Sequence, residues 1–271
     1  MLTLTDSLIL ARHDVAATFR GRKGLALAIL LFLLAAAPAL VRFLGQHSDQ
    51  AAALQRAHSA AMVRLYDRDI ARALLDCPAV LVVAAIATFF FQPLFVLLAG
   101  ADRLAGDIDT GSIRYWTVRA PRTGVLLGKT LGLWAVVSLL SAGVLLSMTV
   151  LAVIDVPRDW LWTLGWSGRI LVYSAASALV YASLCTLLGV LLARPRLVLV
   201  VGMGVLFVMR IGRTALENHG APKLALLLPG ALDHLFLSPG AAPKLTAVAV
   251  TAVWSATLLG AAAVLFRRRS L

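Results

Sequence analysis

A charged segment between two apolar runs contains the side chains of this sequence that are best suited to binding a partner. It covers residues 100–129, and its first half combines acidic and basic residues: Asp102, Arg103, Asp107, Asp109 and Arg114. A second set repeats at helical spacing on another face: Leu104, Ile108, Gly111 and Tyr115. Residues 102–115 are therefore predicted to form a short amphipathic helix that docks into a groove on a soluble protein. A surface loop that rests on lipid headgroups is the alternative.

Two other patterns could suggest nucleotide or metal chemistry, but each lacks a necessary part. The run GVLLGKT at 124–130 resembles a phosphate-binding loop, yet its first glycine is one position too close and no strand precedes it. Two histidines and two aspartates occur in one polar stretch, but no close histidine pair shares a helical face. These four residues are His47, His58, Asp67 and Asp69. We predict no metal site and no cofactor in this chain.

Serines within apolar runs raise the question of an intramembrane protease or lipid transferase. Ser138, Ser141 and Ser174 have no histidine or lysine partner within a predicted span, and serine chemistry would need such a base. The two cysteines, Cys77 and Cys185, cannot build a disulfide framework. The sequence therefore predicts a chain that is not an enzyme, with an intramembrane enzyme as an alternative.

The composition is that of an integral membrane protein. Hydrophobic residues make up 61% of the 271 residues and charged residues 14%, whereas soluble domains have about 45–50% apolar and about 25% charged residues. The net charge of +12 arises from basic residues at the ends of apolar runs, where anionic lipid attracts them. Aromatic residues do not interleave with these basic residues to form a stacking platform, which argues against nucleic-acid binding.

The apolar runs predict an all-α membrane protein with six spans in a single domain, residues 1–271. A span needs roughly 20 apolar residues to cross a bilayer core of about 30 Å. The predicted spans cover about residues 24–42, 79–99, 129–153, 169–192, 197–212 and 246–266.

The segments around these spans have their own patterns. Residues 2–19 predict an amphipathic helix in the membrane interface, with Leu4, Leu8, Ala11, Val15 and Phe19 on one face. Residues 45–77 form a polar external excursion. The Pro- and Gly-rich residues 219–245 contain two apolar pieces that are too short to cross, which indicates a re-entrant or interfacial hairpin.

Six spans place both ends of the chain on the same side of the membrane. Basic residues at the span ends favour the side that carries the termini and residues 100–129, which is the cytoplasmic side by the positive-inside rule. We therefore expect the charged segment in the cytoplasm.

Three short motifs in that segment resemble type-2 ABC exporter permeases. They are Asp107-Ile108-Asp109-Thr110-Gly111-Ser112, then Pro121-Arg122, then Gly128-Lys129. Permeases of that family have an acidic pair before Gly-Thr, a Pro and an Arg about ten residues later, and Gly-Lys at the start of the third span. The interfacial N-terminal helix, the six spans and the hairpin before the last span match as well.

The resemblance implies a permease that works as a dimer, here a homodimer, in a bacterial inner membrane. Two copies of a separate ATP-binding ATPase, which holds ATP and Mg²⁺, would dock on the coupling helix 102–115. The expected ATPase contacts are Asp102, Arg103, Leu104, Asp107, Ile108, Asp109, Ser112 and Tyr115. Arg119, Arg122 and Lys129 are expected to hold the base of the third span to lipid phosphate or to the N-terminal helix.

A force-transmitting or sensory membrane subunit that moves no solute is a second interpretation of the same pattern. A coupling helix would be equally useful for transmitting movement to an external partner. The predicted spans contain almost no charge away from their ends, which favours a lipid-like, amphipathic or peptide substrate over a small ion.

Overall fold

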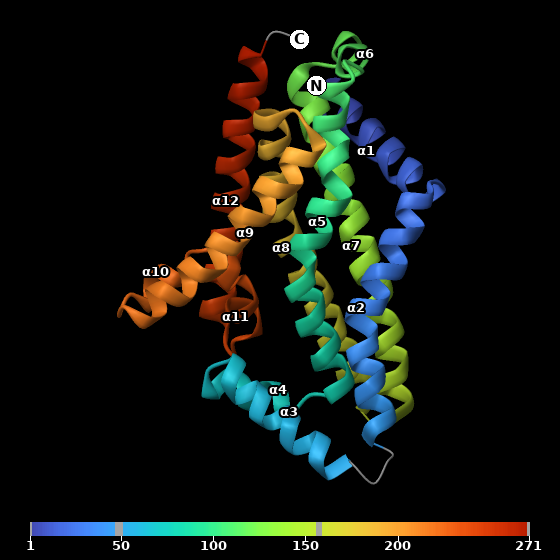
Figure 1. Ribbon diagram of the computed structural model, residues 1–271. Coiled ribbons are helices and arrows are strands. Elements are labelled where there is room, and N and C mark those ends of the chain that lie inside the picture. The colour runs from blue at the N-terminus through green and yellow to red at the C-terminus, as the bar shows by residue number, and fades with distance from the viewer. Residues whose placement is uncertain (1, 47–50, 156–158, 270–271) are drawn as a thin grey trace.

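The computed structural model describes residues 2–46, 51–155 and 159–269, and within these ranges the chain is helical and has no strand. Long helices run side by side along one axis, and shorter helices lie at the two ends of this bundle and along one side of it (Figure 1). The first helix starts and the last helix finishes at the same end, which we call the terminal end. The predicted all-α fold is confirmed.

The helices have the following bounds in chain order. They are α1 (Leu2–Arg20), α2 (Arg22–Gln46), α3 (Ala51–Leu65), α4 (Arg68–Leu75), α5 (Ala79–Asp109), α6 (Ile113–Arg119), α7 (Arg122–Asp155), α8 (Trp160–Leu192), α9 (Pro195–Asn218), α10 (Pro222–Ala225), the 3-10 turn η2 (Pro229–Ala231), α11 (Leu232–Leu237) and α12 (Ala241–Arg268).

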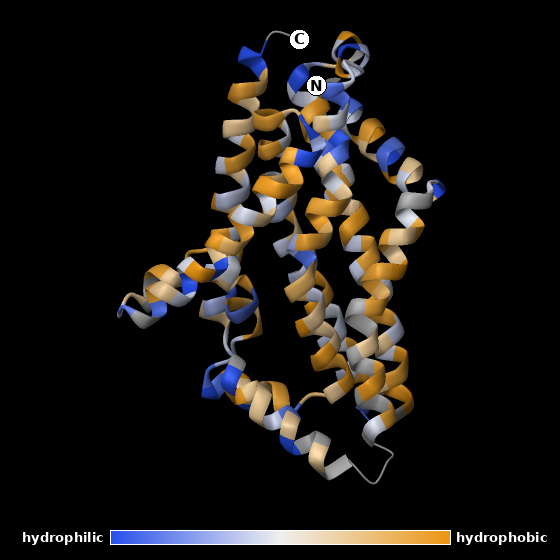
Figure 2. Cartoon of the chain, viewed as in Figure 1, coloured by the Kyte–Doolittle hydropathy of each residue, from blue (hydrophilic) through white to orange (hydrophobic). Residues whose placement is uncertain are grey.

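Five of these helices are long and apolar enough to cross a membrane: α5, α7, α8, α9 and α12. The first of the six predicted spans, 24–42, falls within α2, where the apolar helix among the described residues is shorter and covers Gly24–Leu33. By length and composition the described residues thus show five of the predicted spans, and the span predicted at 24–42 stays a prediction. Figure 2 shows apolar residues along the shaft of the bundle and hydrophilic residues concentrated toward the ends of the helices.

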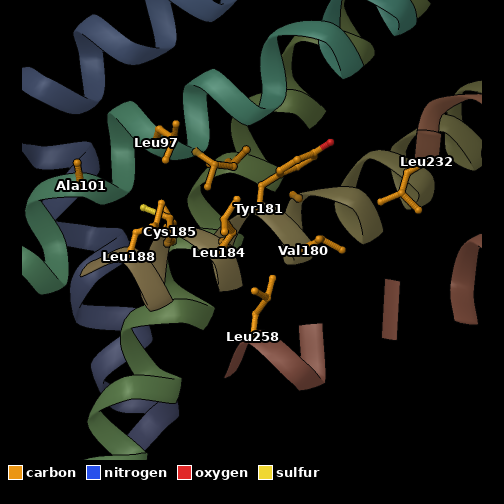
Figure 3. Close-up of a cluster of buried hydrophobic side chains, with 14 of the residues drawn as sticks. Leu97, Ala101, Val180, Tyr181, Leu184, Cys185, Leu188, Leu232 and Leu258 are labelled. Carbon is orange, nitrogen blue, oxygen red and sulfur yellow. The ribbon is translucent and has the colours of Figure 1, made fainter. Parts of the chain in front are cut away.

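The central helix of the bundle is α8, because it packs against α5, α7, α9 and α12. Small residues on α8 are buried there and permit close helix contact; they are Ser174, Ala178, Ala182, Cys185 and Gly189. Leu97 and Ala101 of α5 face α8 in the core shown in Figure 3, which Leu258 of α12 also reaches.

A polar lock joins α5 to α8 within this apolar core. The amide nitrogen of Gln92 donates hydrogen bonds to the carbonyl oxygen of Ser174 at 2.8 Å and to its hydroxyl at 2.9 Å. The Ser177 hydroxyl donates to the amide oxygen of Gln92. Water cannot bond a polar group in the bilayer core, so a buried amide there needs partners within the protein. The two serines of α8 supply them.

Helices α3 and α4 lie at the end opposite the termini, and the segment between α9 and α12 lies at one side of the bundle, between its two ends (Figure 1). Within the segment predicted as a hairpin, residues 219–240 fold into α10, η2 and α11, which double back against α9 and α12. Arg213 of α9 holds this segment, because its guanidinium donates to the Gly230 carbonyl oxygen at 2.8 Å and lies 3.4 Å from Asp233 and 2.8 Å from Glu217.

His234 of α11 contacts Tyr66, which lies between α3 and α4, and the ring centroids are 4.6 Å apart. Burial lowers the pKa of His234 below its usual value. The charged groups that act on it come from three elements: Asp233 of α11, Arg213 and Glu217 of α9, and Asp67 before α4. Burial outweighs the carboxylates, so neutral His234 favours this contact.

Acidification is expected to weaken the contact at His234. A histidine with a lowered pKa binds fewer protons when folded than when unfolded, so its stabilising contribution is present above about pH 6.5 and is lost as the pH falls toward the folded pKa. The unfolding temperature of the wild type should drop from pH 7.5 to pH 5.5 more than that of His234→Asn. His219→Asn, an exposed control, should keep the wild-type pH response; an equal response in all three proteins would show that His234 does not titrate in this range.

Candidate functional site

The segment predicted as one helix over 102–115 is divided in two in the structure. Helix α5 continues without interruption to Asp109, and at roughly 1.5 Å per residue its 31 residues span roughly 46 Å, more than a bilayer core of about 30 Å. The chain then turns at Gly111, whose φ of +73° is a conformation that favours glycine. The separate helix α6 follows. The predicted bounds are therefore wrong: residues 102–109 belong to the end of a span.

Helix α6 is anchored to the bundle by one apolar face. Ile113 is buried and Trp116 half-buried in a cluster with Leu104 of α5 and Val125 and Leu126 of α7. Leu10 of α1, Val190 of α8 and Phe266 of α12 belong to the same cluster. Because the cluster joins six helices, α6 is fixed to the terminal end of the bundle.

The burial of Leu104 corrects its predicted role as an anchor for a partner, because only 3% of this residue is exposed. Ile108 is half-buried against the same cluster. The side of the segment that faces outward includes Tyr115, which is 53% exposed, and Val118, which is 86% exposed. Asp109, Ser112 and Arg114 are exposed as well.

A buried charge cluster lies beneath α6 and ties α1, α5 and α7 together. Lys129 of α7 is only 8% exposed, and its ammonium nitrogen lies 3.1 Å from Asp14 Oδ1 and 2.9 Å from Asp107 Oδ2. It also lies 5.5 Å from the centre of the Trp116 ring. Asp107 accepts a further hydrogen bond from the Ser112 hydroxyl at 3.0 Å. One ammonium thus links the N-terminal helix, the end of α5 and the turn before α6.

Arg103 binds α1 from the next turn of α5. Its guanidinium donates to the Thr18 hydroxyl at 2.6 Å and to the Ala99 carbonyl oxygen at 3.2 Å. Its Nη1 lies 4.0 Å from Asp14 Oδ2. Asp102, the neighbour of Arg103, is exposed. Arg103 and Asp107, which were expected to contact a partner, therefore engage the chain's own helices.

The predicted anchors of the third span take different positions. Lys129 does contact the N-terminal helix, through Asp14. Arg122 instead caps α12, because its Nη1 donates to the carbonyl oxygens of Phe266 at 3.3 Å, Arg267 at 3.0 Å and Arg269 at 2.9 Å. A cation at the C-terminal end of a helix satisfies carbonyl groups that lack helical partners. The side chain of Arg119 lies outside the described part of the structure.

Three glycines at a spacing of four let α1 lie directly on α7. Gly124, Gly128 and Gly132 all face α1, and a Cβ at Gly128 would stand 2.8 Å from Leu10 Cβ and 2.9 Å from the Ser7 carbonyl oxygen. The residues 124–130 that resemble a phosphate-binding loop are thus part of the helix α7 and of this contact.

The buried stripe of α1 differs from the apolar face predicted for it. Ser7, Leu10, Ala11 and Asp14 are buried against the protein, whereas Leu8 and Phe19 of the predicted face are exposed. The Ser7 hydroxyl also donates to the Gly124 carbonyl oxygen at 3.0 Å. Small and polar residues together with Leu10 therefore hold α1 to the bundle, whereas Leu8, Ile9 and Phe19 are exposed.

Sequence reasoning missed Asp14 and Trp116 as members of this site. Lys129 gave the available signal, because an ammonium at the start of an apolar run needs a counter-charge. Its partner Asp14 is 115 positions away in the sequence, so no local pattern could identify it. Among the described residues, histidine, cysteine and acidic side chains form no group that could hold a metal ion; His47 lies outside them.

A bundle of apolar helices of membrane length, with a short helix fixed across one end, is the architecture of a multi-pass integral membrane protein. A comparison with protein families matches the family described as ABC-2 family transporter protein over residues 8–271. The chain belongs to this family, as its sequence motifs predicted, and is a membrane permease component of an ABC-2 type transporter. A comparison with curated proteins gives no match. Permeases of this family generally pair with ATP-binding subunits and are typically non-catalytic.

Proposed function

We propose that this chain is the permease subunit of an ABC exporter in a bacterial inner membrane and works as a homodimer with two copies of an ATPase subunit. ATP and Mg²⁺ bind to the ATPase subunits. In this proposal α2 also crosses the membrane, which brings the number of spans to six. Both termini and α6 are cytoplasmic. The observation that carries the proposal is the position of α6: its inner face is part of the core, and its outer face is open at the end of a continuous membrane helix.

The proposed docking surface for the ATPase is the outward side of the turn and α6. It keeps Asp109, Ser112 and Tyr115 from the sequence-based prediction and adds Arg114 and Val118, which are also exposed. Apolar and aromatic side chains beside charges of both signs suit a groove on a soluble protein. Leu104, Arg103 and Asp107 are left out because they contact the chain's own helices.

The mechanism follows from how this surface is attached. A partner can bias the membrane helices only through an element that makes different contacts in the two states. The Lys129 cluster and the apolar cluster around Ile113 join α6 to α1, α5 and α7. A movement of α6 would therefore displace the ends of these three helices together. Because α5 is one helix from Ala79 to Asp109, the displacement would continue into the membrane.

The docking surface can be tested with a double variant, Tyr115→Ala and Val118→Asp, co-expressed with the ATPase subunit. Loss of central apolar contacts typically costs about 2 kcal/mol or more per residue, so we expect the amount of ATPase that co-purifies to fall at least about tenfold. ATP hydrolysis by the purified complex should lose its dependence on the permease. The unfolding temperature of the permease should fall only slightly, because both side chains are exposed and Tyr115→Ala removes an edge contact with the Trp116 ring, whose centroid is 5.5 Å away.

The matched control is Val63→Asp, which places the same charge on an exposed valine of α3 at the opposite end. This variant should retain the ATPase. If the α6 double variant retains the ATPase as well as the wild type does, α6 is not the docking element and the proposed surface is wrong.

A further inference from the structure

A cavity of about 660 Å³ lies between the elbow of α1 and α2 and the end of α5. Gly21 joins α1 to α2 at this elbow. The elbow stands out from the bundle, and α2 runs back from it toward α5 (Figure 1). The cavity has an apolar part lined by Leu27 and Leu30 of α2 and Leu98 of α5. Its volume is in the range of sites that hold organic ligands of moderate size, about 300–1,000 Å³.

The other part of the cavity is lined by charges of both signs. Three carboxylates, from Asp14, Asp102 and Asp107, stand beside two cations, Arg103 and Lys129. The charges described here suit a ligand that carries a positive and a negative group. A simple anion would meet the three carboxylates, and a simple cation would meet the guanidinium and the ammonium.

Three buried polar atoms in this charged part have no hydrogen-bond partner among the described residues. They are Asp14 Oδ2, Arg103 Nη1 and Asp107 Oδ2. Asp107 Oδ2 lies 2.9 Å from the Lys129 ammonium, whereas Asp14 Oδ2 and Arg103 Nη1 form an ion pair at 4.0 Å, which is too long for a hydrogen bond. The side chain of Asp14 is only 10% exposed. A buried carboxylate oxygen without a donor and a buried guanidinium nitrogen without an acceptor are costly. A ligand that offers a donor to one and an acceptor to the other would remove both costs.

We propose that this cavity binds a phospholipid with a primary-ammonium headgroup, such as phosphatidylethanolamine. The phosphate would accept from Arg103, since guanidinium groups suit phosphate oxygens. The ammonium would donate to Asp14. The upper part of an acyl chain would lie along Leu27, Leu30 and Leu98. A soluble zwitterion would leave this apolar part unfilled, which is why we assign the site to a lipid. The elbow joins α1, which has exposed apolar side chains, to the apolar helix α2. Such a junction between an interfacial helix and a membrane helix lies at the level of the lipid headgroups.

The test is native mass spectrometry of the full chain in detergent with phosphatidylethanolamine, phosphatidylcholine and phosphatidylglycerol of equal chain length. Phosphatidylethanolamine should bind about tenfold more tightly than the other two, because choline cannot donate a hydrogen bond to Asp14 and glycerol carries no positive charge. Leu98→Trp, which fills the apolar part, and Arg103→Gln, which removes the phosphate contact, should each reduce binding of phosphatidylethanolamine about tenfold. Leu146→Trp on the exposed side of α7 is the control and should bind like the wild type.

Several results would overturn the proposal. Equal binding of the three lipids would remove the role of the charged groups, and equal binding by Leu98→Trp and Leu146→Trp would place the lipid elsewhere. Soluble phosphoethanolamine that displaces the lipid at equal concentration would assign the site to a small zwitterion. Absence of bound lipid in the folded wild type would leave only water in the cavity. The measurement uses no ATPase, so its failure would not affect the proposed exporter function.

Discussion

Replacing Lys129 with methionine is expected to lower the unfolding temperature of this permease by about 10 °C. The ammonium lies between Asp14 and Asp107. Its removal leaves the Asp107 carboxylate without a cation among the described residues, and leaves Asp14 beside the more distant Arg103 guanidinium at 4.0 Å. Breaking a buried ion pair in this way costs roughly 3–5 kcal/mol, which corresponds to several degrees in the unfolding temperature of a chain of this size. Thermal unfolding in detergent, followed by tryptophan fluorescence or light scattering, measures the effect.

A triple variant separates the charges from the packing. Lys129→Met combined with Asp14→Asn and Asp107→Asn removes the uncompensated carboxylates and leaves Arg103 its hydrogen bonds to Ala99 and Thr18; replacing both partners of a buried ion pair is often close to neutral. It should therefore recover most of the lost stability, and the permease should still lose its effect on ATP hydrolysis if the cluster transmits movement. Lys244→Met, at the start of α12, is the control and should change stability by less than about 0.5 kcal/mol. If Lys129→Met is as stable as this control, the cluster does not hold the three helices together.

Gly128→Leu is expected to separate α1 from α7. Any Cβ at this position would stand within 3 Å of Leu10 and of the Ser7 backbone, and a leucine needs considerably more room. Overpacking of a close contact costs about 1–3 kcal/mol and occasionally more, and here a whole helix must move away. Limited proteolysis should cut within residues 2–20 at least about tenfold faster than in the wild type, with a lower unfolding temperature.

Gly143→Leu provides a matched control on the same helix. A Cβ at Gly143 would meet nothing within 4 Å, and leucine favours a helix over glycine by somewhat less than about 1 kcal/mol. The same substitution should thus leave proteolysis of α1 unchanged and leave stability equal or slightly higher. Equal behaviour of the two leucine variants would show that α1 does not depend on the glycine contact.

Apolar run length was sufficient to predict an all-helical membrane protein, because each long helix must be apolar over the thickness of the bilayer. It was less informative about helix ends. The predicted span at 79–99 continues to Asp109 in α5, since a helix does not stop where it leaves the lipid. Gly111 marked the true end of the helix, because a positive φ is favourable for glycine, but in the sequence it also fitted a helical stripe with Leu104 and Ile108.

The sequence pattern indicated residues 102–115 as the site, while the direction of their side chains could not be predicted. Helical spacing places Leu104 and Ile108 on one face and cannot distinguish a face toward a partner from a face toward the chain's own core. The structure turns Leu104 inward and Tyr115 and Val118 outward. The contact of Lys129 with Asp14 requires α1 to pack against α7. The glycines at 124, 128 and 132 permit this packing, but their spacing alone did not predict it.

Photocrosslinking from position 118 is the most direct test of the central claim that the ATPase docks on the outer face of α6. A photoreactive amino acid would replace Val118 in one variant and Val63, an exposed valine of α3 at the opposite end of the bundle, in another. Both variants would be irradiated in the assembled complex. We predict a crosslink to the ATPase from position 118 and none from position 63. A crosslink from position 63, or no crosslink from position 118 in an assembled complex, would contradict the proposed coupling.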